Sequence, residues 1–251
     1  MAISEKSHFF ACILDSAPVM RRVLNFFVTR KWTMNAAVTT SLAERIADLG
    51  GIPIERIRVI PPPGTATMED LIRVNDAKAG RCELVDNTLV EKAMGWSESL
   101  IAAVLLRWLG NFVESVNAGI LTGADGMTML FPGVIRGPDV AFVSWQTLPN
   151  GRIPTEPVPE LAPDFVIEVL SRGNTRAEMA RKRREYFQGG VRLVWMVDTR
   201  NRTIAVYTSS ETVTVIEEGE MINGGSVLPN WSFDTGDLFA ELDRKAPTPH
   251  N

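Results

Sequence analysis

The segment Ala162–Ser171 reads APDFVIEVLS, and this stretch decides the fold. Its run of Phe, Val, Ile and Leu residues is typical of an interior strand of a sheet. Glu168 interrupts that run with a carboxylate. An ionised carboxylate inside a sheet costs free energy unless a cation or several hydrogen bonds pair with it. The stretch therefore predicts a buried strand whose acidic side chain needs a partner.

A second acidic residue opens another apolar run, GPDVAFVSW, at Asp139. Asp164 is nearer to Glu168 in sequence, but at ~3.3 Å per residue the two are ~13 Å apart along one strand. Ligands of a hard cation each lie ~2.0–2.6 Å from it. Asp139 can come beside Glu168 by lateral pairing, because neighbouring strands lie ~4.8 Å apart. Two oxygen ligands on adjacent strands suit Mg²⁺ or Mn²⁺.

Each of these acids also has a purely structural interpretation. Glu168 could accept hydrogen bonds from a nearby arginine or a helix N-terminus. Asp139 could simply begin a strand or turn after its proline, and we expect that role for Asp164.

The segment NTRAEMARKRREYFQGG predicts a helix from Arg176 to Gln188, with Thr175 and Glu178 as a capping box. At ~100° per residue one stripe contains Met179, Arg183, Tyr186 and Phe187, with Lys182 at its edge. A lysine there could reach a site at the end of the sheet. Periodicity does not choose Lys182 over Arg183, and a solvated basic face is the alternative.

Other elements follow from pattern and turn residues. TMEDLIRV after Thr67 predicts a short helix, and CELVDNTLVEKAMG a hairpin around Asp86 and Asn87. SESLIAAVLLRWLGNFVESV predicts a buried helix with Ser97 or Ser99 as its N-cap. Strands are expected around GILTG, TMLFPG, DVAFVSW, VRLVWMVD, TIAVYT and TVTVIEE.

This order of elements predicts an α/β domain with a mixed sheet flanked by helices. The closing strands and the NWSFDTGDLF segment are expected to cover the sheet edge and to pack Trp231 and Phe233. Trp195 is interpreted as a core residue and not as a platform for stacking bases.

The proline-rich stretch IPPPGTAT predicts an extended connector. We expect an N-terminal appendage at 1–64, part of which could be disordered, a main domain at 65–243 and a C-terminal tail at 244–251. A short helix is expected within 35–50, and Met34 is a candidate start codon.

Composition narrows the chemistry. The net charge of −4 gives no general attraction for polyanions, so any contact with nucleic acid needs a local basic surface. The histidines, His8 and His250, lie near the ends, which leaves carboxylates, Lys and Arg as candidate catalytic groups. Cys12 and Cys82 have no metal-ligand spacing and indicate reduced thiols and a cytoplasmic protein. The FFACIL stretch is too short for a membrane span, so neither export nor a membrane partner is expected.

A cation held by two carboxylates beside an ammonium group suits phosphodiester hydrolysis. Residues from about Thr67 to Leu242 resemble the Uma2-like (DUF820) restriction endonucleases of the PD-(D/E)xK nuclease superfamily. The matching stretches are RCELVDNTLVEKAMG, RGPDVAFVS, APDFVIEVLS, NTRAEMARKRREYFQGGVRLVWMVD, RTIAVYT and INGGSVLPNWSFDTGDLF.

The resemblance implies a restriction-endonuclease-like sheet with a C-terminal β-hairpin extension, and it implies site roles. Asp139 matches the Asp of the PD motif, and Glu168 the acidic residue of the (D/E)xK motif. The lysine expected two residues later is Leu170 here, and it looks relocated to Lys182. The Val169 carbonyl would complete the metal ligands, and Glu83 matches an acidic position that faces the cleft or else is an exposed hairpin residue.

The leading hypothesis is a Mg²⁺-dependent or Mn²⁺-dependent endodeoxyribonuclease in which Lys182 orients the attacking water. A homodimer is compatible with cutting both strands, although no segment indicates an interface. A nuclease-like fold that binds nucleic acid or protein without cutting is the alternative. Hydrolysis of glycosides by paired carboxylates is a weaker one.

Overall fold

The computed structural model describes residues 41–77, 80–93 and 95–246. The fold described below belongs to the unit from Ser41 onward. The candidate start at Met34, the first part of the helix expected within 35–50 and the last residues of the expected tail lie outside the described residues.

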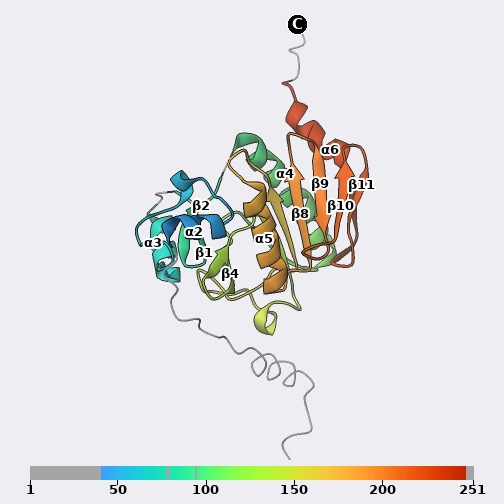
Figure 1. Cartoon of the computed structure of the whole chain (residues 1–251). Helices are drawn as coiled ribbons and strands as arrows, with labels where there is room; N and C mark the ends of the chain where they lie inside the picture. Colours follow the sequence, from blue (N-terminus) through green and yellow to red (C-terminus); the bar gives the residue numbers. More distant parts are fainter. Residues whose placement is uncertain (1–40, 78–79, 94, 247–251) are drawn as a thin grey trace, which may run out of the picture. The chain divides into compact units, whose positions relative to one another are not determined.

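A six-stranded sheet forms the centre of this unit (Figure 1). Only the central pair β7–β8 is parallel among the pairings within this sheet, so the expectation of a mixed sheet is confirmed. The strand order is β10-β9-β8-β7-β6-β3. The strands are β3 (Gly119–Gly123), β6 (Val140–Ser144), β7 (Phe165–Val169), β8 (Leu193–Asp198), β9 (Thr203–Tyr207) and β10 (Val213–Glu217).

Strand β7 is the interior strand that the FVIEV sequence predicts, and all five of its residues are buried. Side chains alternate between the two faces of a strand. Phe165, Ile167 and Val169 therefore share one face, where they join the largest apolar core. Val166 lies on the other face in a second core, and Glu168 has the same parity as Val166.

Helix α4 (Trp96–Val116) covers the first of these faces. Five of its residues are buried in the largest core: Ile101, Val104, Leu105, Leu109 and Val113. By length and composition α4 is the one helix of the described chain that could cross a membrane, but its apolar side packs on β7 and β6 as expected. The predicted serine N-cap is wrong, because extended backbone at Gly95 starts the helix before Ser97 and no side chain caps it.

Strands β11 (Met221–Gly224) and β12 (Leu228–Asp234) form the C-terminal hairpin, followed by α6 (Thr235–Ala240) and a 3₁₀ turn (Glu241–Asp243). Trp231 of β12 stacks on Trp195 of β8, with ring centroids 5.3 Å apart and an interplanar angle of 12°. The core role of Trp195 is thereby confirmed, as is the packing of Trp231. The expectation that this segment covers the sheet edge is wrong, because its aromatic residues lie on the face of an interior strand.

A second, four-stranded antiparallel sheet has the strand order β2-β1-β5-β4. Its strands are β1 (Cys82–Val85), β2 (Thr88–Glu91), β4 (Thr128–Phe131) and β5 (Val134–Arg136). The predicted hairpin turn is present, with positive φ at Asp86 (46°) and Asn87 (55°) as a tight two-residue turn requires. The predicted capping box of Thr67 and Asp70 begins α3 (Met68–Asp76).

The segment before the prolines packs on this hairpin. This segment contains helix α2 (Leu42–Asp48) and a 3₁₀ turn (Ile54–Arg56). Ile52 and Ile57, on either side of that turn, are buried with Val85 and Val90 of the hairpin. Gly64 and Ala66 then donate backbone hydrogen bonds to the carbonyl of Asn87. Residues 41–64 therefore share a core with the hairpin that follows them.

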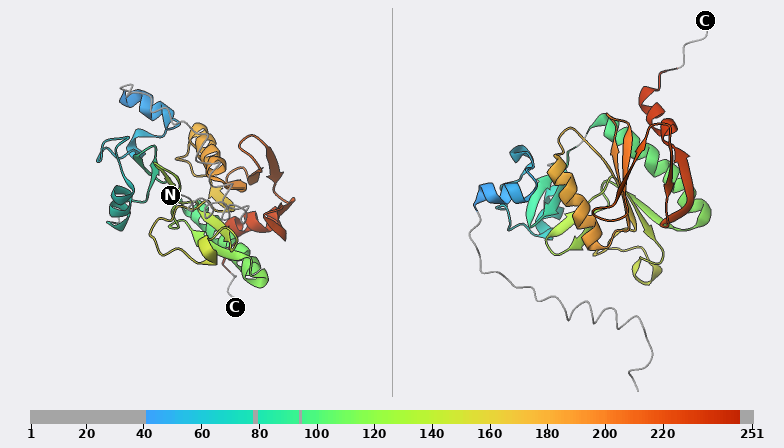
Figure 2. Two further views of the ribbon diagram at one scale, coloured as in Figure 1. Left: turned by 90° about the horizontal axis from the view of Figure 1, so that it is seen from below. Right: turned by 45° about the vertical axis from the view of Figure 1, so that its right-hand side comes forward.

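Helix α5 (Arg176–Gly189) lies against the second face of the six-stranded sheet, between that sheet and the hairpin (Figures 1 and 2). The predicted capping box of Thr175 and Glu178 is confirmed. The predicted stripe did not choose between Lys182 and Arg183; in the structure Lys182 is buried and Arg183 is partly buried. The buried residues of α5 are Glu178, Met179, Lys182, Glu185 and Tyr186. The neighbouring sheet supplies charged partners, so polar residues face inward.

Candidate active site

The register of the sheet brings the two predicted carboxylates together. Strands β6 and β7 are antiparallel, with Val140 opposite Ile167. Asp139 immediately precedes β6, so the same register places it opposite Glu168. Residues opposite each other in an antiparallel pair project from the same face, with Cβ atoms ~4.5–5.5 Å apart. Both line one small cleft on the α5 side.

Asp139 is held by two hydrogen bonds. Its Oδ2 accepts from the backbone N–H of Val169 at 2.8 Å, which ties it to the strand that carries Glu168. Its Oδ1 accepts from Lys92 Nζ at 3.0 Å. Lys92 follows the end of β2, and its ammonium also contacts the carbonyl of Gly137. The carboxylate of Asp139 therefore faces the cleft with a lysine from the hairpin beside it.

Lys182 joins two acids at the centre of the cleft. Its Nζ lies 2.9 Å from Oε1 of Glu168 and 3.0 Å from Oε1 of Glu83. The hydroxyl of Tyr186, one helical turn after Lys182, donates to the same oxygen of Glu168. The i, i+4 spacing places both donors of α5 above β7. Lys182, and not Arg183, is thus the basic residue of α5 that reaches the acids.

Glu83 is buried, so its interpretation as an exposed hairpin residue is wrong. Its Oε2 accepts from Arg136 at 2.7 Å, and its Oε1 accepts from the N–H of Gly137 at 3.1 Å. Arg136 also donates its Nε to Glu185 of α5 at 2.9 Å. A buried Arg–carboxylate network therefore fixes the hairpin, β5 and α5 around the cleft.

The charges set the ionisation of the cleft. Burial raises the pKa of Glu168 above its usual value; Lys182 opposes the rise, and repulsion from Asp139 adds to it. Burial also disfavours ionised Glu83, yet the charges of Lys182 and Arg136 hold the pKa of Glu83 well below its usual range. Burial would lower the pKa of Lys182, but Glu168 and Glu83 raise it above its ordinary value. Lys182 is therefore an ammonium ion at neutral pH.

Asp164 lies apart from this cleft, as expected from its spacing. It accepts hydrogen bonds from the N–H of Ser144 at 2.8 Å and from Arg192 at 3.2 Å. These partners belong to the opposite end of β6 and the start of β8. The prediction of a structural role for Asp164 is confirmed.

Sequence reasoning missed three residues of the cluster: Lys92, Arg136 and Glu185. Arg136 stands three residues before Asp139, and Lys92 ends the hairpin. A basic residue beside each acidic motif was the signal available, but it does not reveal which acid each cation meets. Tyr186 belongs to the stripe predicted from helical spacing, but that spacing does not predict its hydrogen bond to Glu168.

The cleft offers two carboxylates to a hard cation, but no third acidic, His or Cys side chain of the described residues is placed to join them. Among residues 41–77, 80–93 and 95–246, no group of three or more His, Cys, Asp or Glu side chains is arranged to hold a metal ion. A divalent ion here would rest on the oxygens of Asp139 and Glu168 with a backbone carbonyl as a further ligand. Burial is the main cause of the raised pKa of Glu168, and the repulsion from Asp139 that adds to it is what a cation between the two acids would relieve.

The available space is small. The cleft encloses about 10 Å³, on the order of one water molecule. The hydrogen bond from Lys92 to Asp139 occupies one oxygen that such an ion would need. The alternative for Glu168 was an ion pair with a nearby arginine. Among the described residues, Glu168 instead forms its ion pair with Lys182.

Comparison with known proteins gives a family match and a similar solved structure. The family model named Uma2, described as "Putative restriction endonuclease", matches residues 68–236, which is more than half of the chain. Among solved structures, "a putative nuclease belonging to DUF820" from Anabaena variabilis ATCC 29413 is similar, with 20% sequence identity and a TM-score of 0.59. The match covers 65% of this chain and 92% of that chain, and at this identity it shows the fold alone.

A search of the curated proteins finds no match. The family match supports a nuclease-like protein. The chain belongs to the Uma2 family.

Proposed function

We propose that the protein is a divalent-metal-dependent endonuclease that hydrolyses phosphodiester bonds in DNA. The observation that carries the proposal is the placement of Asp139 directly opposite Glu168 on adjacent antiparallel strands, with Lys182 in contact with Glu168. These three residues line a single cleft, whose other charged residues are Glu83, Glu178, Lys92 and Arg56. Two acids and one ammonium group are the set that positions a cation and a nucleophile at a phosphodiester.

Asp139 and Glu168 would hold the cation through their carboxylate oxygens. In an antiparallel ladder a residue directs its N–H and its C=O toward the same neighbouring strand. The N–H of Val169 points to Asp139, so its carbonyl faces the same side and is the proposed third ligand. Bound Mg²⁺ or Mn²⁺ would lower the pKa of a water ligand and neutralise charge on a phosphoryl oxygen.

Lys182 would orient the attacking water and stabilise negative charge at the phosphoryl group. It can donate protons in hydrogen bonds but cannot accept one, because its raised pKa keeps it an ammonium ion. Glu83 is a positioning residue in this scheme, since its carboxylate contacts the ammonium group of Lys182 alongside Glu168. Lys92 would shift from Asp139 when a cation binds.

The test is cleavage of supercoiled plasmid DNA by the full chain with Mg²⁺, Mn²⁺ or EDTA. Asp139→Asn and Glu168→Gln should lower the cleavage rate by about 10²-fold or more, because each removes a ligand charge. Asp164→Asn is the matched control, since Asp164 is also a buried acid after a proline but lies outside the cleft. It should cut at nearly the wild-type rate.

Metal binding supplies a readout that does not depend on activity. Calorimetry with Mn²⁺ should show binding by the wild-type chain and by Asp164→Asn, and weak or no binding by Asp139→Asn. Wild-type cleavage rates in either cleft variant would refute the assignment of the site, and cleavage undiminished by EDTA would refute metal dependence.

One observation favours a second candidate, a nuclease-like fold that binds without cutting. Each acid already contacts a lysine, Asp139 through Lys92 and Glu168 through Lys182, so the cluster is partly neutralised without a metal. If calorimetry detects neither Mg²⁺ nor Mn²⁺ and plasmid stays intact while oligonucleotide binds, this second function replaces the first.

A further inference from the structure

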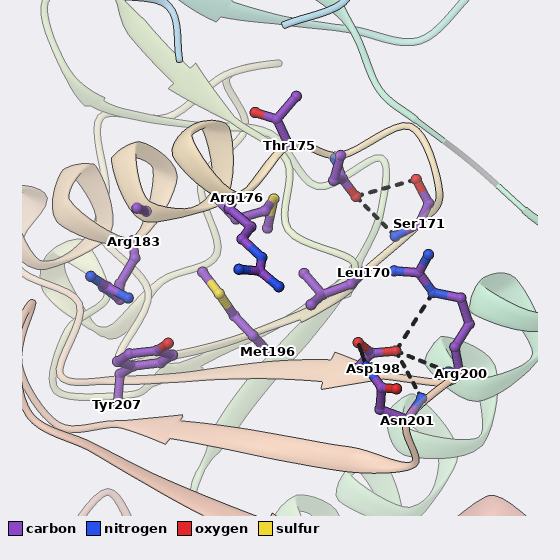
Figure 3. Close-up of a pocket in the computed structure, with 13 residues that line it drawn as sticks. Leu170, Ser171, Thr175, Arg176, Arg183, Met196, Asp198, Arg200, Asn201 and Tyr207 are labelled. Atoms are coloured by element: carbon purple, nitrogen blue, oxygen red, sulfur yellow. Dashed lines mark hydrogen bonds and ion pairs between the residues drawn. The ribbon is translucent and has the colours of Figure 1, made fainter. Parts of the chain in front are cut away.

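A larger pocket lies beside the cleft on the same side of the sheet (Figure 3). Its volume is about 410 Å³, within the ~300–1,000 Å³ typical of small-ligand sites. Leu170, Met179 and Met196 give it an apolar floor. Arg176, Arg183 and Arg200 are its cations. An apolar floor with guanidinium groups around it suits a flat base joined to a phosphate.

The pocket is continuous in sequence and structure with the acids. Leu170 has the same parity as Glu168 on β7, so the floor begins one side chain beyond the catalytic acid. Asn174 lines both the pocket and the cleft. On α5, Lys182 faces the cleft and the adjacent Arg183 faces the pocket. A strand bound across the cleft would therefore reach the pocket with its next units.

Leu170 occupies the position where the (D/E)xK pattern has its lysine. With the ammonium group supplied by Lys182 instead, this position becomes part of an apolar floor. Leu170, the residue after β7, therefore brings no charge to this position and adds an apolar surface on which a base can lie.

Two of the arginines are not committed to acids. Neither Arg176 nor Arg183 forms an ion pair with any residue in the described part of the chain. The Arg183 guanidinium lies 4.4 Å from the ring centroid of Tyr207, and its buried Nε donates no hydrogen bond to a described residue. Figure 3 shows Arg176 extending from α5 into the pocket above Met196.

Asp198 is the one acidic residue that lines the pocket, and its carboxylate accepts hydrogen bonds from the turn that follows it. Oδ1 of Asp198 accepts from the N–H groups of Arg200 and Asn201 at 2.9 and 3.1 Å, and Oδ2 accepts from the amide of Asn201 at 2.9 Å. The Arg200 side chain is 3.7 Å from Asp198, a long contact at an exposed position. Asp198 therefore leaves the charges of Arg176 and Arg183 available, in a chain whose net charge is −4.

We propose that this pocket binds one unpaired nucleotide of the nucleic-acid strand, next to the phosphodiester in the cleft. Its base lies on Leu170, Met179 and Met196, and its phosphate is bound by Arg176 and Arg183. The inference rests on the proposed nuclease function and adds to it a requirement for a locally single-stranded flank.

The test is fluorescence anisotropy with a labelled single-stranded oligodeoxynucleotide and the full chain in EDTA, with a gel to show that the oligonucleotide stays intact. Arg176→Gln and Arg183→Gln should each raise Kd by about tenfold at low salt, because each removes a charge-assisted hydrogen bond. Each should also reduce the slope of log K against log[NaCl] by about 1.

Arg184→Gln is the matched control, since it removes the same charge from an exposed position of the same helix that does not line the pocket. It should leave Kd within about twofold. An oligonucleotide with abasic residues should bind more weakly to the wild-type chain, and this difference should shrink in Arg183→Gln. Circular dichroism and thermal unfolding show whether each variant is folded, and Arg183→Lys, which keeps the charge, should restore part of the salt slope.

Equal effects of Arg183→Gln and Arg184→Gln would overturn the subsite, as would equal binding of abasic and normal oligonucleotides. The outcome is separable from that of the nuclease proposal. A chain that binds through Arg183 but never cuts would keep the pocket and lose the chemistry. A chain that cuts plasmid normally after both pocket substitutions, with unchanged affinity, would keep the chemistry and lose the pocket.

Discussion

The two faces of the six-stranded sheet each hold an apolar core but differ in their buried charges. The face under α4 and β12 is apolar and holds an aromatic group of Phe165, Trp195, Trp231 and Phe233. The face under α5 carries a buried charged network that joins Arg136, Glu83, Lys182 and Glu168. The strands of this sheet present alternate side chains to the two faces. Of the four network residues, Glu168 belongs to this sheet, whereas Glu83 and Arg136 come from the four-stranded sheet and Lys182 from α5.

The difference separates the residues that stabilise the fold from those that form the charged cleft. Apolar burial and ring packing lower the free energy of the folded state with little dependence on partner identity. Buried ions lower it only when every partner is present, and an apolar replacement is often as stable. The charged face is therefore better explained by chemistry in the cleft than by stability.

The largest effect on stability is expected on the apolar face. Trp231→Ala should lower the free energy of unfolding by about 3–5 kcal/mol, because it leaves a cavity beside Trp195 and removes a stacked pair. Chemical denaturation measures the loss. The matched control is Trp96→Ala, since Trp96 is 89% exposed, and it should change stability by less than about 0.5 kcal/mol. Equal losses in the two variants would contradict the assigned core.

A smaller loss is expected when the charged network is broken. Arg136→Met should lower the free energy of unfolding by about 2–4 kcal/mol, because the buried carboxylates of Glu83 and Glu185 lose their shared arginine. Lys182 and Arg181 still contact these two carboxylates. Adding Glu83→Gln and Glu185→Gln should restore much of the stability. If the triple variant is no more stable than Arg136→Met, the loss is not caused by unpaired charge. Arg192→Met, at an exposed pair, is the control.

The smallest effect has the opposite sign. The pKa of Glu168 is raised in the folded chain, so its ionised form is disfavoured there and its contribution to stability falls as pH rises above the usual carboxyl range. Glu168→Gln, measured in EDTA at pH 8, should gain roughly 0.5–1 kcal/mol while losing cleavage. The gain should vanish near pH 4, where the wild-type carboxyl is protonated. A loss of stability at pH 8 that persists at pH 4 would show that Glu168 has a structural role.

Local signals predicted most of the elements. The FVIEV run, the Asp86–Asn87 turn and the capping boxes at Thr67 and Thr175 each depend on a few neighbouring residues, and each is present. The prediction of a serine N-cap for α4 was wrong, because the helix already begins at Trp96, after the extended backbone of Gly95. The placement of β12 failed because a pattern of strands does not say which surface they cover.

The site was predicted in its acids and less well in its cations. Asp139, Glu168 and Lys182 were expected to meet, and they line one cleft. Lys92 in the cleft and the pair of Arg136 with Glu185 beside Glu83 were not expected, because each lies on a different element and no sequence spacing links them. Glu83 came from the family resemblance, and its burial depends on the second sheet.

The sequence by itself determined that strand β7 is buried and that it carries an acid, because apolar periodicity and a misplaced charge are local properties. It also determined the hairpin and the start of α5, since turns and caps are made by residues a few positions apart. Only the tertiary structure decided which cation each acid meets and that Leu170 forms part of a pocket floor. Those contacts join residues distant in sequence, and they depend on register and helix rotation, which no local pattern specifies.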